Sequence, residues 1–356
     1  MKISGIKGKP SLLGLGILGI LIFCMLCAPA CAHYSYEGFP LDTIRSGTGE
    51  VYVSCGDNAG LQGTSYQSNT FVTKFTNVPT GDVEWAELKV GVWGGSTSRV
   101  GRAEANLDGY SLFNETLRAN STVLSNNVDC SGSGIYLIHY NCTNLINQYG
   151  INGDGNITAT VTTTPGSPAL DGRVYGAVLI VAYNNGSSSQ YWINQGNLNL
   201  HKNVTSGGTY YPDLDANITR FNGAVNTSLG NATLTVGYFA GDSSQKDYLY
   251  FNPPDASGSP YNLSNFNWDL NGNWGQKLDG DNVANGTCDT LGFTTKNFDL
   301  HAFDVTVTNS SNYVVFWRGH GNNNNETEIY DPAWPAVNPN TESYVSPFLA
   351  VLKITP

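Results

Sequence analysis

Apolar and polar residues alternate along many short segments of the chain. The alternation is clearest in "ELKVGVW" (87–93) and "TLTVGYF" (233–239). A period of two is typical of β-strands, because successive side chains of a strand point to opposite faces. Ten segments that are rich in β-branched or aromatic residues and bounded by turn-forming residues predict strands: 51–55, 69–75, 86–93, 155–163, 174–183, 190–196, 232–239, 247–251, 312–317 and 348–354.

Beyond residue 32, no segment of about ten residues or more shows the period of an amphipathic helix. One short helical turn is predicted at Cys142–Tyr149, with Thr143 near its start and Gly150 at its end. A strand that alternates buries one face only, so sheets of such strands pack face to face. The sequence therefore predicts an all-β protein.

The two halves of the sequence match in four blocks that keep their order. Residues 51–58 match 190–197, 85–95 match 231–241, 137–143 match 299–306, and 176–183 match 347–354. The third pair aligns His139 with His301, and the offset between blocks grows along the chain, as insertions in the second half would require. We interpret this as an internal duplication that yields two tandem antiparallel β-sandwiches of jelly-roll type, at 33–185 and 186–356, the second with Asn- and Trp-rich insertions.

The first 32 residues are predicted to be an export signal peptide. Three lysines precede an apolar run from Leu12 to Leu26, and small residues at Ala30 and Ala32 favour cleavage before His33. An uncut membrane anchor and a lipid at Cys31 remain alternatives. No later segment is long and apolar enough to span a bilayer, so no transmembrane anchor is expected after signal removal.

Acidic residues outnumber basic ones throughout the predicted mature chain. Residues 33–356 carry 14 basic and 28 acidic side chains, a formal charge of about −14, while 13% of the whole chain is charged. This excess of negative charge argues against nucleic acid as a partner. The abundant polar, β-branched and aromatic residues suit a secreted protein with a nearly neutral surface.

Four cysteines lie beyond the signal: Cys55, Cys130, Cys142 and Cys288. An even number in an exported chain favours disulfides. Our first pairing is Cys130 with Cys142, which would close a local loop. Cys55 would then pair with Cys288 and link the two halves, or pair with another molecule. Four buried thiols are the alternative.

Thirteen Asn-x-Ser/Thr sequons predict a glycoprotein: Asn114, Asn120, Asn141, Asn156, Asn185, Asn203, Asn217, Asn226, Asn231, Asn262, Asn285, Asn309 and Asn325. Asn185, Asn285 and Asn325 lie beside turns and are better candidates than Asn231, which opens a strand. An Asn- and Thr-rich surface also produces such triplets without any glycan.

Two acidic turns are weak candidates for calcium. Asn152 and Asp154 in "NGDGN" and Asp279 and Asp281 in "LDGDN" supply the alternating oxygen ligands that a hard cation prefers. Turns rich in Asn and Asp produce the same letters for conformational reasons. No other cofactor is expected.

No catalytic motif stands out in the sequence. No two histidines have the spacing of zinc ligands, and neither a metalloprotease helix motif nor a serine nucleophile elbow is present. We therefore predict no enzymatic activity.

Tryptophans in polar segments are candidates for glycan binding or for contact between subunits. Trp268 and Trp274 lie in "NFNWDLNGNWGQ", and Trp334 lies in "DPAWPAVNP". Trp93, Trp192 and Trp317 lie in strand patterns and are expected in the core.

Two resemblances extend this interpretation. The segments "AEANLDGYSLF" and "FDVTVTNSSNYVVFW" are similar to parts of the jelly-roll modules of the galactose-binding-like superfamily, which implies that fold for each half. The combination of "DGRVYGAVLIVAY", "YWINQGN" and "NATLTVGYFAGDSSQKDYLYFN" resembles a domain family of unknown function in exported surface proteins of methanogenic archaea. That resemblance implies an archaeal cell-surface location.

These observations favour an envelope structural protein, a surface-layer or sheath subunit that assembles with copies of itself or with other envelope proteins. The final strand of each half or the Asn-rich insertions would supply edges for strand addition. The alternative is an extracellular carbohydrate-binding or adhesion module.

Overall fold

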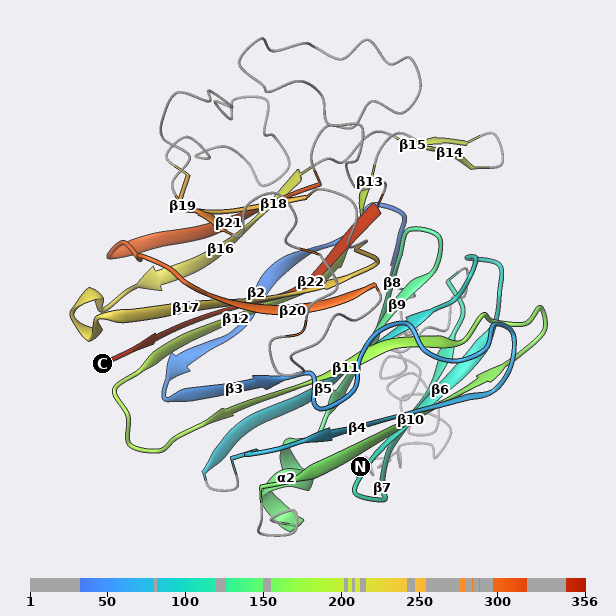
Figure 1. Cartoon of the computed structure of the whole chain (residues 1–356), viewed down its shortest axis with the longest axis horizontal. Coiled ribbons are helices and arrows are strands. Elements are labelled where there is room, and N and C mark those ends of the chain that lie inside the picture. The colour runs from blue at the N-terminus through green and yellow to red at the C-terminus, as the bar shows by residue number, and fades with distance from the viewer. Residues whose placement is uncertain are drawn as a thin grey trace, which may run out of the picture.

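The computed structural model of the chain consists almost entirely of β-strands (Figure 1). The structure describes residues 33–79, 82–119, 126–149, 155–201, 204–206, 209–211, 216–241, 247–253, 276–278, 284, 288, 297–318 and 344–356. All ten predicted strands are present, and the predicted helical turn is helix α2 (Thr143–Tyr149). The all-β prediction is confirmed.

Four main sheets form two sandwiches, and Figure 1 shows their strands in successive layers. The first outer sheet contains, in spatial order, β4 (Asn69–Phe75), β10 (Ile157–Pro165), β6 (Gly101–Leu107) and β7 (Tyr110–Leu117). The first inner sheet contains β1 (His33–Ser35), β8 (Val128–Ser131), β9 (Ile135–Asn141), β5 (Val83–Trp93), β11 (Arg173–Tyr183) and β3 (Glu50–Ser54).

The second sandwich is built in the same way. Its inner sheet contains β2 (Gly38–Thr48), β12 (Gln190–Leu198), β22 (Tyr344–Thr355), β17 (Asn231–Phe239) and β20 (Phe298–Asp304), and β13 (Leu200–His201) also pairs with β22. Its outer sheet contains β16 (Ala216–Ala224), β21 (Ser310–Trp317), β18 (Tyr248–Phe251) and β19 (Gln276–Leu278). A small hairpin of β14 (Val204–Ser206) and β15 (Thr209–Tyr211) and a 3-10 turn, η1 (Thr227–Leu229), complete the described elements.

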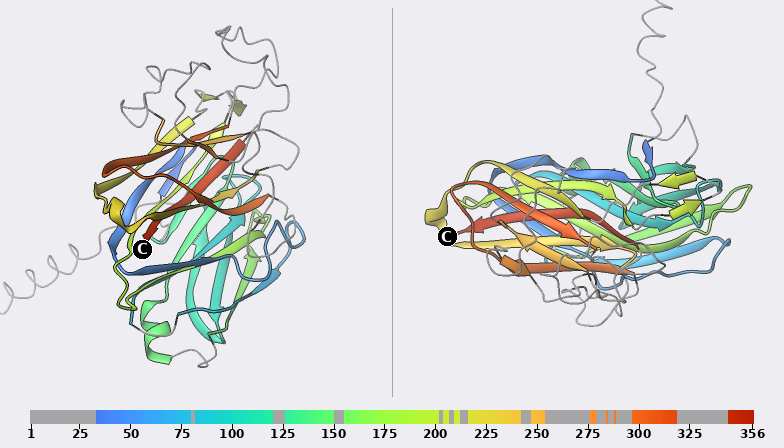
Figure 2. Two further views of the ribbon diagram at one scale, coloured as in Figure 1. Left: turned by 60° about the vertical axis from the view of Figure 1, so that its left-hand side comes forward. Right: turned by 90° about the horizontal axis from the view of Figure 1, so that it is seen from above.

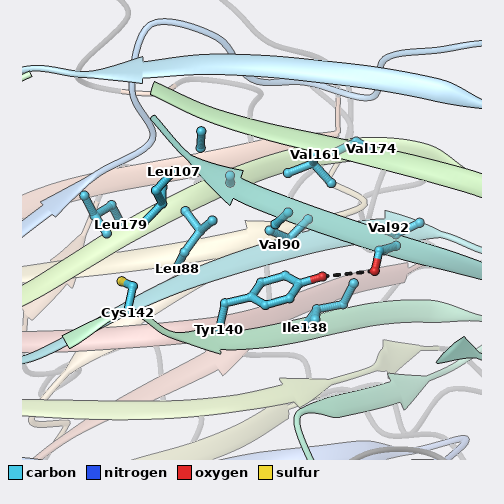
Figure 3. Close-up of a cluster of buried hydrophobic side chains, with 14 of the residues drawn as sticks. Leu88, Val90, Val92, Leu107, Ile138, Tyr140, Cys142, Val161, Val174 and Leu179 are labelled. Atoms are coloured by element: carbon cyan, nitrogen blue, oxygen red, sulfur yellow. Dashed lines mark hydrogen bonds between the residues drawn. The ribbon is translucent and has the colours of Figure 1, made fainter. Parts of the chain in front are cut away.

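The core of the first sandwich lies between its two sheets and follows from the alternation in the sequence. Leu88 and Val90 of β5 point into it, opposite Leu107 and Val161 of the outer sheet (Figure 3). The hydroxyl of Tyr140 donates a hydrogen bond of 3.3 Å to a backbone carbonyl of β6, so this phenol keeps a partner inside the core. The second sandwich has an equivalent core between its own sheets.

The two inner sheets also pack against each other, back to back, and we call this interface the seam. A third buried apolar cluster fills it, with Leu137, Tyr175 and Ile180 from the first sandwich and Ile193 and Val351 from the second. The sheets therefore form four layers with three cores between them. Seen from above, strands of both sandwiches run largely along the long direction of the molecule (Figure 2).

Glycines opposite phenylalanines allow the sheets to approach closely at the seam. Phe239 of β17 faces Gly91 of β5, where an added Cβ would overlap its ring. At Gly176 of β11 an added Cβ would lie 3.0 Å from the ring of Phe298 of β20, a tight contact. The rings of Phe239 and Phe348 stack at 4.1 Å between centroids and 8° between planes. Such stacking stabilises beyond the burial of area alone.

The four matched sequence blocks occupy matched places in the two inner sheets. The order β9-β5-β11-β3 in one sheet corresponds to β20-β17-β22-β12 in the other, and all these neighbours are antiparallel. The final strand of each half, β11 or β22, is paired on both sides. The prediction that these strands supply free edges is therefore wrong.

Two details depart from the sequence alignment. Strand β2, assigned to the first sandwich by the division at residue 185, pairs with β12 and completes the second inner sheet instead. In the first inner sheet, His139 lies opposite Lys89. The sequence alignment matches Lys89 with Thr235, but in the second inner sheet His301 lies opposite the next residue, Val236. The two histidines therefore differ by one residue in register and point to opposite faces of their sheets.

Candidate functional site at the seam

A disulfide joins the two sandwiches across the seam. Cys55, at the end of β3, is bonded to Cys288, and both are fully buried. From the sequence, Cys55–Cys288 was one of the possible pairings, the one that links the two halves of the chain. The cross-link spans 233 residues of chain, and a native disulfide of this kind contributes about 2–5 kcal/mol of stability.

The predicted disulfide between Cys130 and Cys142 is wrong. Both are free thiols buried in the core of the first sandwich. The hairpin of β8 and β9 places Cys130 opposite Tyr136, so Cys142 lies six residues further along the chain. That is roughly 20 Å of extended strand, well beyond the Cα separation of about 7 Å that a disulfide tolerates. Burial raises the pKa of both thiols.

A cluster of charged side chains, the seam cluster, lies on the seam face of the first inner sheet. The Nζ atom of Lys89 is 2.5 Å from Oε1 of Glu87 and 3.2 Å from Nδ1 of His139. The same Nδ1 atom is 2.9 Å from Oε1 of Glu87. The side chain of Lys89 is 0% exposed and that of Glu87 9% exposed, so this ion pair is closed to bulk water.

The cluster continues from the interior to the surface. The Nε2 atom of His139 is 3.0 Å from Oδ2 of Asp129, and Oδ1 of Asp129 is 3.1 Å from Nδ1 of His33. His33 opens strand β1, and its side chain is 42% exposed. A chain of acid–base groups therefore leads from fully buried Lys89 to solvent.

Polar groups of the second sandwich close the cluster from the other side. Lys89 donates to the side-chain carbonyl of Gln195 on β12. Asn197, on the same strand and fully buried, donates to the backbone carbonyls of Asp129 (3.1 Å) and Ile135 (2.9 Å). These bonds fix the register of one sandwich on the other, because an unpaired buried polar group is destabilising.

The pKa values of the cluster follow from burial and neighbouring charge. Burial alone raises the pKa of Glu87, but Lys89 and His139 outweigh it and bring the pKa down to about 2. Complete burial lowers the pKa of Lys89 despite its carboxylate partner. The pKa of His139 is raised, because its bonds to Asp129 and Glu87 outweigh burial and the charge of Lys89. When His139 is protonated, the positive charges of Lys89 and His139 balance the negative charges of Glu87 and Asp129.

We expect the free energy of unfolding to be greatest, and nearly constant, between about pH 4.5 and about pH 6.5. These limits are the usual pKa values of Glu and of His. Stability from Glu87 is present above its usual pKa and is lost as the pH falls towards about 2. Stability from His139 is present below its usual pKa and is lost as the pH rises through the raised value. Urea unfolding at a series of pH values measures both limbs.

The matched control for this profile is His139→Gln. It removes the titrating group, so the alkaline limb should flatten while the acidic limb remains. The lowered pKa of Lys89 acts in the opposite sense at alkaline pH, since losing its proton relieves the penalty of a buried charge. An alkaline limb that is equally steep in the wild type and in the variant contradicts the assignment to His139.

A protein-family model matches most of the chain. The family model described as "Protein of unknown function (DUF3344)" matches residues 34–355. The chain belongs to this family. No curated protein matches the sequence. The family assignment confirms the resemblance to a domain family of unknown function and says nothing about activity.

Among solved structures, PNGase F, a glycosylasparaginase from Flavobacterium meningosepticum, is similar over 87% of this DUF3344 chain and 95% of its own, with 12% identity and a TM-score of 0.24. The plant receptor-like kinase ANX1 is similar over 86% of this chain and 98% of its own, with 9% identity and a TM-score of 0.19. Both TM-scores are too low to transfer a fold or a function.

Several predicted site residues of this DUF3344 protein lie outside the described residues: Asn152, Asp154, Asp279, Asp281, Trp268, Trp274, Trp334, Asn120, Asn203, Asn262, Asn285 and Asn325, together with the predicted signal peptide. Within the described part, no group of three or more His, Cys, Asp or Glu residues is arranged to hold a metal ion. No described helix is long and apolar enough to cross a membrane. Trp192 and Trp317 are buried as expected, and Trp93 is half-buried.

The described sequons differ in exposure. Asn156 is half-buried. Six others are exposed: Asn114, Asn141, Asn185, Asn226, Asn231 and Asn309. Asn217 on β16 is 1% exposed, and its amide nitrogen is buried. A glycan attached there would have no path out of the fold.

We therefore expect glycans on exposed sequons and none on Asn217. Glycopeptide mass spectrometry of protein purified from its native source measures occupancy at each site. Asn185, in the exposed turn after β11, is the matched positive site. Full occupancy at Asn217 contradicts the described position of β16.

Proposed function

We propose that this protein is an exported structural subunit of an archaeal cell envelope, a surface-layer or sheath component that assembles with copies of itself. The observation that supports it best is the seam. Apolar side chains, a disulfide and a buried charged cluster fill the space between the two sandwiches. Two domains that open and close around a substrate need a polar, mobile interface, whereas this one is packed like a domain core.

The tandem organisation supports the same proposal. The shared strand order of the two inner sheets is what duplication of one jelly-roll-like sandwich produces. Fusing two such units back to back gives a rigid block whose shape does not depend on a hinge. A lattice built from identical subunits needs this property, because every copy must present the same surfaces to its neighbours.

Strand β7 offers a surface for such contacts. It lies at the edge of the first outer sheet and pairs with β6 alone among the described strands. A register shift between Glu104 and Asn106 marks a bulge, and Phe113 beside it is 62% exposed. Tyr110 on the same strand is also exposed. Exposed aromatic side chains at a sheet edge are typical of contacts between subunits.

Extraction of native envelopes in hot SDS, followed by mass spectrometry of the peptides, tests the proposal. We expect the chain in the insoluble fraction both with and without reductant, since Cys55 and Cys288 pair within one molecule and the other two thiols are buried. Sedimentation velocity of the purified protein should show association that Phe113→Ser weakens and Val72→Ser, at another exposed site of the same sheet, does not. Complete extraction as a low-abundance monomer contradicts the structural role.

The second candidate is extracellular carbohydrate binding or adhesion. It is favoured by a surface at the loop end of the first sandwich, where Arg99 lies over the ring of exposed Tyr66 and Asp171, whose carbonyl accepts from Tyr66, holds Arg173.

A further inference from the structure

Three loops meet at the end of the first sandwich where β5 ends and β11 begins. They are residues 55–68, 94–100 and 166–172. Backbone bonds join them: the N–H of Tyr66 donates to the carbonyl of Asp171 (2.8 Å), and the N–H of Asp171 donates to the carbonyl of Gly94 (3.0 Å). These bonds hold the loops as one surface.

Tyr66 stands out within this surface. Its φ is +64°, a left-handed conformation that is unfavourable for an aromatic residue, and the residue as a whole is 48% exposed. The guanidinium of Arg99 lies 4.3 Å from the centroid of its ring, and Nη1 of Arg99 donates to the carbonyl of Ala169 (2.9 Å). Arg99 therefore covers one face of the ring of Tyr66.

A second arginine completes the surface. Arg173 is held by Asp171, which is buried, through Nε–Oδ1 and Nη2–Oδ2 bonds of 2.7 and 3.2 Å. These bonds come first among the causes that raise the pKa of Arg173; partial burial lowers it, and the negative charge of Asp171 raises it further. Arg173 pairs in register with Trp93, and both are half-buried. We call Tyr66, Arg99 and Arg173 the aromatic–arginine surface.

Six of the eight described sequons lie away from this surface. They are grouped at the opposite ends of the strands, near the C-terminus and helix α2: Asn141, Asn156, Asn185, Asn226, Asn231 and Asn309. None of the three loops contains a sequon. Two arginines beside one buried carboxylate also form a basic spot on a chain with 17 basic and 28 acidic residues.

We propose that the aromatic–arginine surface binds an acidic saccharide, a chain of sugars that carry carboxylates. The ring of Tyr66 offers a flat apolar face for the C–H groups of a pyranose. The N–H groups of Arg99 and Arg173 that are not engaged in the bonds above suit a carboxylate, which a guanidinium binds through paired hydrogen bonds. An inorganic anion would need the arginines but not an exposed ring held at a strained position.

Isothermal titration of the full chain with hexagalacturonate tests this inference. We expect binding that weakens with salt, and a neutral hexasaccharide, maltohexaose, should not compete. Tyr66→Asn keeps a residue that tolerates positive φ and removes the ring, and it should raise Kd about tenfold or more. Arg99→Gln should do the same, while Arg99→Lys should retain part of the affinity.

Ile44→Asn is the control, since Ile44 is an exposed apolar residue on β2, outside these loops and outside β7. Unchanged thermal unfolding shows that each variant is folded. The inference is overturned if hexagalacturonate does not bind, or binds equally to the wild type and the Tyr66→Asn variant. It is also overturned if inorganic phosphate displaces the saccharide at equal concentration, which indicates an anion site only, or if polyglutamate binds more tightly, which indicates an acidic peptide. Failure of self-association leaves the inference standing, because the site lies within one copy of the chain.

Discussion

Replacing Lys89 with methionine is expected to lower the free energy of unfolding by about 3–5 kcal/mol at pH 8. Methionine fills similar space, so packing changes little. The change leaves the carboxylate of Glu87, 9% exposed, without its closest cation, and leaves the side-chain carbonyl of Gln195 without its donor. A buried charge that loses its partner keeps the full penalty of desolvation.

The expected loss depends on pH. His139 is 2.9 Å from the same oxygen of Glu87, and below its raised pKa it supplies a second positive charge. The Lys89→Met variant should therefore lose less stability at pH 6 than at pH 8. Chemical unfolding monitored by tryptophan fluorescence at the two pH values measures this difference.

Two further variants separate charge from packing. The double change Glu87→Gln with Lys89→Met removes both charges of the pair and should recover much of the stability, since a buried ion pair is often no better than a neutral pair of equal volume. Lys74→Met, at an exposed position of β4, should change stability by no more than about 0.5 kcal/mol. A neutral effect of Lys89→Met alone would show that the ion pair does not hold the seam.

The elements of the fold follow from local pattern, whereas their arrangement does not. Alternation in β5 and β17 predicts strands with one buried face, and the structure places Leu88 and Leu234 in the two sandwich cores as expected. The opposite face of β5 carries Glu87, Lys89 and Gly91, a pattern that predicts exposure to solvent. They are buried because the second sandwich packs against this face, and the local sequence of β5 does not indicate that a second sandwich will cover it.

Long-range register explains the remaining differences. The alignment of His139 with His301 is wrong by one residue, and a shift of one residue moves a side chain to the other face of a strand. Cys130 and Cys142 are close in sequence, but the hairpin of β8 and β9 separates them. The sequence offered the pairing of Cys55 with Cys288 only as the remainder after Cys130 and Cys142 were paired, because four cysteines allow three pairings. The seam cluster was not accessible to sequence reasoning, because it combines residues of β5, β8, β9 and β12.

Truncating Phe239 to alanine is expected to lower the free energy of unfolding by about 3–5 kcal/mol. The ring is 1% exposed, stacks on Phe348 and contacts Tyr175 across the seam, at 5.4 Å between centroids. Its loss leaves a cavity between two sheets that are held apart by the neighbouring rings, so collapse is restricted. The matched change Phe113→Ala, at an exposed ring, should have little effect on the stability of the monomer.

A double-mutant cycle between Gly91 and Phe239 tests whether the sheets meet as described. Gly91→Ala alone should destabilise, because its methyl group would overlap the ring of Phe239. In the Phe239→Ala background the same methyl group enters the cavity and should be tolerated or favourable. The two changes should therefore be coupled by about 1–3 kcal/mol, as expected for residues in direct contact. Additive effects would mean that β5 and β17, strands of the two sandwiches, do not face each other, and the rigid seam on which the proposed structural role rests would be lost with them.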